Sequence, residues 1–303
     1  MLLLVKPGMT QNNEKISAIA YGKINLYLDI LSKMENGYHS IESVMQSVSL
    51  GDKITLEVLD VDGDNQIEIK TQCQVIPNDK SNLVYKTASA FLERTNTIGK
   101  RLIFEIEKNI PISAGMAGGS SDGATAMKLL NEYFGSPLTL DELCEIGARI
   151  GADIPFCLTG GTCICQGIGE RITRLTPLKD MLLVCAIDNS SVSTPVAFSM
   201  LDEKFGTRPM PHGALEKMKL AIEGGNISEV SSLLYNKFED VIIPKIPSIS
   251  KIKEIMTENG ANGTLMSGSG PSVFGIFDNE KSQIKAYNAL KNCSIRAFLC
   301  KTI

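Results

Sequence analysis

The stretch from Pro111 to Met127 reads PISAGMAGGSSDGATAM and has the composition of a phosphate-binding loop. Glycines at 115, 118 and 119 let the backbone approach a ligand closely, because no Cβ atoms stand in the way. Two serines follow at the start of an expected helix, where free N–H groups and the helix dipole attract anions. The lysine of a Walker A loop is missing, so the pattern predicts a phosphate site built from backbone N–H groups.

Other interpretations of this stretch are a plain flexible connection and two different glycine motifs. Gly119–Gly123 reads GSSDG and fits the G-x-S-x-G elbow of serine hydrolases, with Asp153 and His212 following in the order Ser…Asp…His. An elbow needs a strand that runs directly into the serine, whereas here a proline-containing loop intervenes. The dinucleotide fingerprint G-x-G-x-x-G occurs nowhere after an expected strand. The phosphate loop is the interpretation we favour, and the hydrolase is the runner-up.

Two charged residues stand where general acid–base chemistry is feasible. Asp153, in GADIPF, lies between the end of an expected helix and Pro155, so its backbone is constrained and its carboxylate can be aimed. Spacing alone leaves open whether Asp153 is a base or caps a helix. Lys23 interrupts an apolar segment, where a lysine either extends outward or pairs with a buried carboxylate.

The first half of the chain reads as strands followed by helices. Strands are expected in KISAIAYGKINLYLDIL, SIESVMQSVSL, KITLEVL, NQIEIKT and RLIFEIE, with turns at ENGY and at Gly51-Asp52. SNLVYKTASAFLERT repeats apolar residues at helical spacing, with Ser81 or Asn82 as its cap. TLDELCEIGARIG has Thr139 as cap, Glu142 three residues later and Gly151 at its end.

The second half predicts a split βαβ arrangement. MLLVCAI, the two strands of GTLMSGSGPSVFGIF, and SIRAFLC are expected strands; TPVAFSMLDEKF, SISKIKEIMTENG and EKSQIKAYNALKN are expected helices. Their order is strand–helix–strand–strand–helix–strand, which matches the split βαβ layout. We expect an α+β protein with two domains, residues 1–172 and 173–303.

Composition narrows the class of protein. The chain has 303 residues, a net charge of −4 and no long basic run, which argues against nucleic acid or an anionic membrane as partner. No stretch reaches the ~20 apolar residues of a membrane span, and the N-terminus lacks a signal peptide, so we expect a cytoplasmic protein. The eight cysteines form no C-x-x-C pair and are expected to be reduced, mostly buried thiols.

Several separated stretches together resemble one family, the GHMP kinases. PISAGMAGGSSDGA resembles the ATP loop of that family, AYGKINLYLDIL its first motif, and GTLMSGSGPSVFG its C-terminal glycine motif. GKINLYLDIL with NGYHSIESVMQSVSLGDKI, and GADIPFCLTGGTCICQGIGE, are similar to the members whose acceptor carries a cytidine diphosphate. The family's loop usually has leucine at Met116 and alanine at Gly123, and both departures are small.

The resemblance implies a two-domain fold with the active site in the cleft between the domains. The N-terminal domain would be a ribosomal-S5-domain-2-like α/β domain that binds ATP, and the C-terminal domain a ferredoxin-like one that binds the acceptor. Asn82 and Lys108 would lie near adenine. The ATP loop would comprise Pro111, Ile112, Ser113, Ala114, Gly115, Met116, Ala117, Gly118, Gly119, Ser120 and Ser121.

The resemblance also assigns the chemistry and the acceptor contacts. Asp153 would accept the proton of the acceptor's 2-hydroxyl. Lys23 would lie beside Asp153, hold its carboxylate ionised and polarise the hydroxyl. Mg²⁺ would accompany ATP, with Ser121 as a candidate ligand. Tyr38 would stack on cytosine and His39 would hydrogen-bond it. The other expected acceptor contacts are Asn25, Thr194, Phe198, Gly268, Ser269 and Gly270. The expected partner is a small cytidine-diphosphate substrate, bound by a monomer or a homodimer, and another small-molecule acceptor within the family is the alternative.

Overall fold

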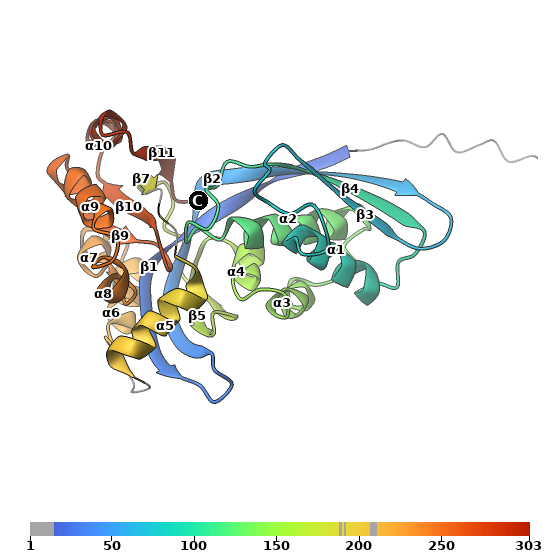
Figure 1. Ribbon diagram of the computed structural model, residues 1–303, viewed down its shortest axis with the longest axis horizontal. Coiled ribbons are helices and arrows are strands. Elements are labelled where there is room, and N and C mark those ends of the chain that lie inside the picture. Colours follow the sequence, from blue (N-terminus) through green and yellow to red (C-terminus); the bar gives the residue numbers. More distant parts are fainter. Residues whose placement is uncertain (1–14, 188–189, 191, 207–210) are drawn as a thin grey trace, which may run out of the picture.

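Two β-sheets with helices packed against them form the molecule (Figure 1). The computed structural model describes residues 15–187, 190, 192–206 and 211–303. The first sheet has the order β3-β4-β2-β1-β8; β5 pairs with the other half of β2, and β6 pairs with β5. The second has the order β11-β7-β10-β9. Two long strands, β1 (Lys15–Lys33) and β2 (His39–Asp60), extend from the first layer to the second.

The N-terminal layer follows the expected order of elements. The strands of the first sheet, after β1 and β2, are β3 (Gln66–Thr71), β4 (Lys100–Glu107), β5 (Thr162–Gly167) and β6 (Arg171–Arg174). The helices below it are α1 (Leu83–Arg94), α2 (Gly118–Tyr133), α3 (Leu140–Ala148) and α4 (Ile154–Thr159). Asn82 caps α1, and Thr139 and Glu142 form the expected capping box of α3.

The expected turn at Gly51-Asp52 is wrong, because β2 runs through both residues. Gly51 pairs with Tyr21 across the sheet. A Cβ at Gly51 would lie 2.5 Å from Cγ2 of Ile19, so this glycine provides room for a neighbouring strand. Asp52 is fully buried, and its carboxylate accepts hydrogen bonds from the N–H groups of Asn109 and Ile110.

The C-terminal layer has the strand order of a split βαβ fold. Its four strands are β7 (Leu182–Ile187), β9 (Gly263–Met266), β10 (Ser272–Phe277) and β11 (Arg296–Lys301), all antiparallel to their neighbours. The helices expected from the sequence are α5 (Thr194–Phe205), α9 (Ser248–Glu258) and α10 (Glu280–Asn292). The sequence reading missed α6 (Leu215–Glu223), α7 (Ile227–Ser232) and α8 (Glu239–Ile242).

The two layers share parts of the chain. β8 (Tyr235–Asn236) comes from the C-terminal half but pairs with β1 in the first sheet. Residue 172, where the sequence suggested the domain boundary, lies inside β6. We therefore propose the division between β6 and β7, with β8 as a segment that returns to the first sheet.

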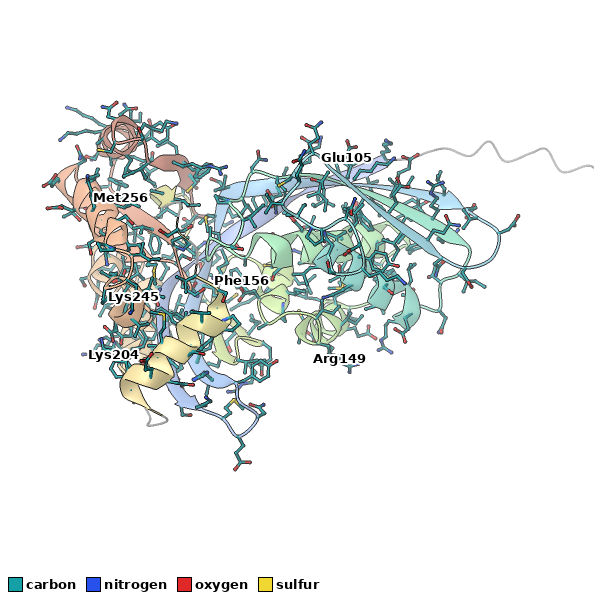
Figure 2. All side chains as sticks on the ribbon, viewed as in Figure 1. Glu105, Arg149, Phe156, Lys204, Lys245 and Met256 are labelled. Atoms are coloured by element: carbon teal, nitrogen blue, oxygen red, sulfur yellow. The ribbon has the colours of Figure 1, made fainter. Side chains whose placement is uncertain are left out.

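Buried apolar side chains fill the space between sheets and helices. Phe156 and Met256 point inward, whereas Glu105, Arg149, Lys204 and Lys245 lie on the outer surface (Figure 2). All eight cysteines are free thiols; four are buried, three are half-buried and Cys293 is exposed. No helix in the described part of the chain is long and apolar enough to cross a membrane.

Candidate active site

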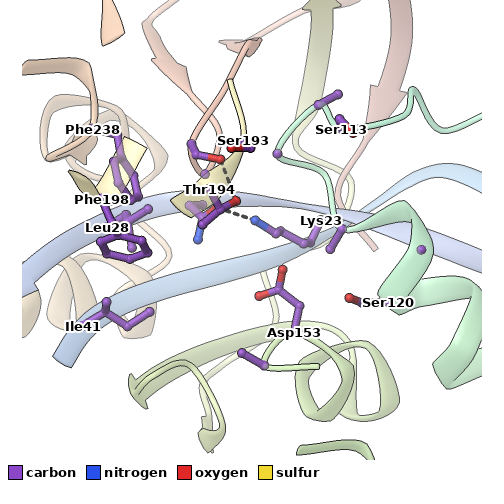
Figure 3. Close-up of a pocket in the computed structure, with 18 of the residues that line it drawn as sticks. Lys23, Leu28, Ile41, Ser113, Ser120, Asp153, Ser193, Thr194, Phe198 and Phe238 are labelled. Carbon is purple, nitrogen blue, oxygen red and sulfur yellow. Dashed lines mark hydrogen bonds between the residues drawn. The ribbon is translucent and has the colours of Figure 1, made fainter. Parts of the chain in front are cut away.

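A cleft with a volume of about 580 Å³ lies where the two layers meet. The N-terminal layer contributes β1, the glycine loop before α2 and the start of α4, and the C-terminal layer contributes α5 and the glycine turn between β9 and β10 (Figure 3). Of the expected site residues, the cleft is lined by Lys23, Asn25, Tyr38, Ser113, Ala114, Gly115, Ala117, Gly118, Gly119, Ser120, Asp153, Thr194, Phe198, Gly268 and Ser269.

The glycine loop contains left-handed backbone conformations, which glycine adopts readily and other residues adopt only with strain. φ is positive at Ser113 (53°), Gly115 (72°) and Ala117 (55°), and α2 begins directly after Ala117. A Cβ at Gly115 would lie 2.1 Å from the carbonyl oxygen of Ser267, whose hydroxyl donates to the carbonyl of Gly115 at 2.9 Å. The loop therefore packs backbone to backbone against the C-terminal glycine turn, and left-handed residues of this kind cluster at ligand sites.

Two members of the loop serve as anchors. Met116 is buried, and its carbonyl accepts the N–H of Lys23 at 3.1 Å. The Ser121 hydroxyl donates to the Tyr21 carbonyl at 2.6 Å, and the residue is only 2% exposed. Ser120, by contrast, lines the cleft (Figure 3). Both anchors fix the loop on β1.

The Ser121 geometry contradicts the hydrolase interpretation. Its hydroxyl is occupied by a backbone carbonyl, so it cannot serve as a nucleophile. The His212 ring stacks on Tyr235 at 3.9 Å between centroids, while its backbone N–H donates to Asp29. No catalytic triad is formed by Ser121, Asp153 and His212.

A second cavity, of about 310 Å³, adjoins the loop on the side of α1. It is lined by Asn82, Lys108, Pro111 and Ile112, and it shares Ser113, Gly118 and Gly119 with the main cleft. Both polar atoms of the Asn82 amide bond to nearby backbone groups. The oxygen accepts the Val84 N–H at 2.8 Å, and the nitrogen donates to the Pro77 carbonyl at 2.6 Å.

Lys108 lies between two buried carboxylates at the edge of this second cavity. Its ammonium contacts Asp52 and, at 2.7 Å, Asp122. Burial raises the pKa of Asp122 to about 8, although the Lys108 charge works in the opposite direction. The other oxygen of Asp122, Oδ1, is buried without a hydrogen-bond partner in the described residues. Because Asp52 and Asp122 share one ammonium, Asp122 retains its proton more readily than an isolated carboxylate does.

Lys23 and Asp153 face the same part of the cleft but form no ion pair in the described structure. Lys23 is 4% exposed and donates to Oδ1 of Asn25 at 2.6 Å (Figure 3). The Asn25 amide in turn donates to the Ser43 hydroxyl at 2.8 Å, which donates to the Tyr27 carbonyl at 2.7 Å. This series of hydrogen bonds orients the Lys23 ammonium.

Asp153 is the residue before the first turn of α4, yet its side chain makes no capping hydrogen bond. Its carboxylate points into the cleft between Lys23 and Ser120 (Figure 3). The capping alternative left open by the sequence is therefore not what this side chain does. An uncommitted carboxylate in a cleft can accept a proton from a bound hydroxyl.

Aromatic side chains occupy the end of the cleft away from the loop. Tyr38 is 59% exposed and lines the cleft, as does Phe198 of α5. His39 does not line the cleft; its ring stacks on Phe198, with centroids 4.4 Å apart and planes at 13°. The hydroxyls of Thr194 and Ser269 are 3.0 Å apart and join α5 to the C-terminal glycine turn (Figure 3).

Sequence reasoning missed the apolar lining and most supporting carboxylates. Leu28, Ile41, Val192 and Phe238 complete the aromatic end of the cleft. They have no signature beyond apolarity, so no local pattern distinguishes them from core residues. Asp52, Asp122 and Asp202 act from neighbouring elements, and the only local signal is a charged residue in an apolar strand or near a glycine loop.

The comparisons with known proteins agree with this architecture. The family model for the GHMP kinases N terminal domain matches residues 82–161, and that for GHMP kinases C terminal matches residues 215–295. The chain belongs to the GHMP kinase family.

Individual relatives match this chain along most of its length. The chain is 45% identical to the 4-diphosphocytidyl-2-C-methyl-D-erythritol kinase of Caldicellulosiruptor bescii, over 90% of this chain and 93% of that protein. It is 39% identical to the enzyme of that name from Enterococcus faecalis, over 94% and 98%. A crystal structure of 4-(cytidine 5'-diphospho)-2C-methyl-D-erythritol kinase superposes with a TM-score of 0.80, at 26% identity over 95% of this chain and 99% of that one. Homoserine kinase from Cytophaga hutchinsonii shares the fold, with a TM-score of 0.76 at 17% identity, over 99% and 97%.

Proposed function

We propose that this protein transfers the γ-phosphoryl group of ATP to the 2-hydroxyl of 4-diphosphocytidyl-2-C-methyl-D-erythritol, giving the 2-phosphate and ADP in isoprenoid precursor biosynthesis. The observation that carries the proposal is the match to curated kinases of that name at up to 45% identity along most of the chain. The cleft supports it, because a glycine loop, a free carboxylate and a pair of aromatic rings follow one another along its wall.

The nucleotide end uses the backbone. We assign the triphosphate to the N–H groups of the loop from Ser113 to Ser120, where α2 begins. The helix dipole and the amide N–H groups replace the missing lysine. We assign adenine to the smaller cavity beside Asn82 and Lys108, which opens on the same loop.

The centre of the cleft carries the chemistry. Asp153 accepts the proton of the 2-hydroxyl as the oxygen attacks the γ-phosphorus, in a roughly in-line displacement. Lys23 lines the same cleft as Asp153, and we assign its ammonium the stabilisation of negative charge on the hydroxyl oxygen. Lys23 donates a hydrogen bond to Asn25 and forms no ion pair with Asp153 in the described structure, so we assign its charge to the substrate. Asn25 then serves mainly to hold Lys23.

Mg²⁺ completes the ATP site in this proposal. The described residues contain no cluster of three or more His, Cys, Asp or Glu side chains that could hold a metal. Mg²⁺ bound through nucleotide phosphates needs only one or two protein oxygens, so this site still fits it. The Ser121 hydroxyl donates to the Tyr21 carbonyl, so we assign the ligand role to the Ser120 hydroxyl instead. The ion, when bound, neutralises the charge of the β- and γ-phosphates.

The acceptor end uses side chains of both layers. We assign the cytosine ring to the space between Tyr38 and Phe198, which both line the cleft and supply flat apolar faces. Thr194, Gly268 and Ser269 lie between this end and the glycine loop, where hydroxyl and N–H donors suit the diphosphate or the erythritol. Gly270 is not among the residues that line the cleft.

ADP release in the presence of ATP and Mg²⁺ tests the function directly. The acceptors to compare are the cytidine-diphosphate methylerythritol, mevalonate, homoserine and galactose. We expect turnover that depends on the cytidine substrate, with an increase in product mass of one phosphoryl group. Faster turnover of any other acceptor in the panel contradicts the proposed substrate while keeping the kinase class.

A further inference from the structure

Helix α5 is tied to the β1–β2 hairpin by one carboxylate that the proposed function does not use. Asp202 on α5 accepts from the Lys33 ammonium at 2.5 Å, and its other oxygen lies 2.7 Å from Nε2 of His39. Lys33 and His39 face each other across the hairpin as paired residues of β1 and β2. A single side chain therefore joins the two layers at the acceptor end of the cleft.

The Asp202 carboxylate also holds the His39 ring that covers one face of Phe198. Asp202 follows Phe198 by four positions in α5, so the two side chains lie on the same face of the helix. The His39 ring covers one face of Phe198, and Phe238 meets its ring at 5.0 Å and 75°. Phe198 lines the cleft while His39 does not, so a ring bound in the cleft has the other face of Phe198 available.

We propose that Asp202 is a positioning residue for the acceptor, an inference that rests on the proposed function. Through Nε2 of His39 it holds the imidazole flat behind Phe198, and through Lys33 it fixes the hairpin end that carries Tyr38. The separation of the Tyr38 and Phe198 rings, which is the slot for a flat base, depends on this link. His39 thus supports the stacking ring from behind and does not read the base with its imidazole.

Charge and burial explain why the link needs a carboxylate. The His39 side chain is 4% exposed, so loss of its acceptor leaves a buried N–H group without a partner. The Lys33 side chain is 35% exposed and can return to water. Removal of Asp202 therefore releases the imidazole and with it Phe198, while Lys33 is solvated. A neutral asparagine retains an oxygen for the Nε2 hydrogen and loses only the ion pair, which is weak at an exposed site.

Steady-state kinetics of Asp202→Ala and Asp202→Asn test the proposal. We expect Asp202→Ala to raise KM for the cytidine substrate about tenfold, which corresponds to ~1.4 kcal/mol, and Asp202→Asn to raise it less. The kcat and the KM for ATP should stay within about twofold. Asp180→Asn removes another aspartate–lysine pair, Asp180–Lys301 at 2.5 Å, which is exposed and does not line the cleft, and should change none of these values. An unchanged KM in Asp202→Ala, or an equal rise in both KM values, overturns the inference.

Two further measurements separate this inference from the proposed function. Absence of cytidine-dependent turnover in the wild-type protein contradicts the function, and cytidine diphosphate binding by calorimetry then tests the slot without catalysis: weaker binding in Asp202→Ala supports it and equal binding overturns it. The chain has only two histidines, so a spectrum of ¹⁵N-histidine-labelled protein is simple, and His212→Gln assigns it. We expect an exchange-protected Nε2–H signal from His39 that disappears in Asp202→Ala. Its absence from the wild-type protein contradicts the link.

Discussion

The two ends of the cleft differ in the groups that line them: backbone at one end and aromatic side chains at the other. At the loop end, backbone segments of Gly115 and Ser267 touch each other, and we assign the phosphates to main-chain N–H groups at the start of α2. At the acceptor end, the walls are the rings of Tyr38 and Phe198, contributed by different layers. A backbone site tolerates many side-chain changes but not an added Cβ, whereas a side-chain site has the opposite sensitivity.

Asp153 lies between the two ends, and its loss should have the largest effect. Asp153→Asn keeps the size of the side chain. The Asp153 side chain makes no capping hydrogen bond that the substitution could remove, so the fold should be retained. We expect kcat to fall by about 10²–10⁴-fold, the usual contribution of a general base. Asp141→Asn, an exposed aspartate in the first turn of α3, is the control and should be active. Near-normal turnover of Asp153→Asn would remove this residue from the chemistry.

A single methyl group in the loop should break the nucleotide end alone. In Gly115→Ala the new Cβ meets the Ser267 carbonyl at 2.1 Å, and φ is +72°, so the loop must move away from the C-terminal turn. We expect KM for ATP to rise tenfold or more, with ~1–3 kcal/mol of stability lost to backbone strain. Gly135→Ala also has positive φ (+77°) but open space around it. It should lose stability without changing KM for ATP; equal KM effects in both variants would show that strain alone is responsible.

Loss of one ring should affect the acceptor end alone. Tyr38 is 59% exposed, so Tyr38→Ala should leave the melting temperature nearly unchanged. Stacking of a base on an aromatic ring contributes about 1–3 kcal/mol, which predicts a KM for the cytidine substrate raised about tenfold and an unchanged KM for ATP. Tyr38→Phe keeps the ring and should behave like the wild type. Equal effects of Tyr38→Ala on both KM values would argue against the assignment.

The pH dependence of stability at the loop end should depend on Asp122. Burial raises the pKa of Asp122 from 3.8 to about 8 in the folded protein, so between these values the folded state holds a proton that the unfolded state has lost. The contribution of Asp122 to the free energy of unfolding therefore falls as pH rises from about 4 to 8. Asp122→Asn should flatten this part of the profile when urea unfolding is measured across the range, and an unchanged slope would assign the proton elsewhere.

Predictions that rested on local signals are confirmed by the structure. The Asn82 cap, the Thr139–Glu142 capping box and the glycine loop before α2 each depend on residues within a few positions of one another. Their physical cause is local hydrogen bonding and backbone freedom, which composition and spacing reveal directly.

Contacts between distant segments were not predictable in the same way. Gly51 looked like a turn residue, but its reason is the Ile19 side chain on the neighbouring strand. The His39–Asp202 contact joins residues 163 positions apart, so no pattern near Tyr38 and His39 could show that the imidazole faces Phe198. The roles of the site residues carried over from the family remain predictions.

The most direct test is a crystal structure of the protein with a non-hydrolysable ATP analogue, Mg²⁺ and the cytidine substrate bound together. We predict the phosphates on the N–H groups of the loop from Ser113 to Ser120, the cytosine between Tyr38 and Phe198, and the 2-hydroxyl within hydrogen-bonding distance of Asp153, facing the γ-phosphorus. A nucleotide bound away from the loop, or a 2-hydroxyl turned away from Asp153, would contradict the account.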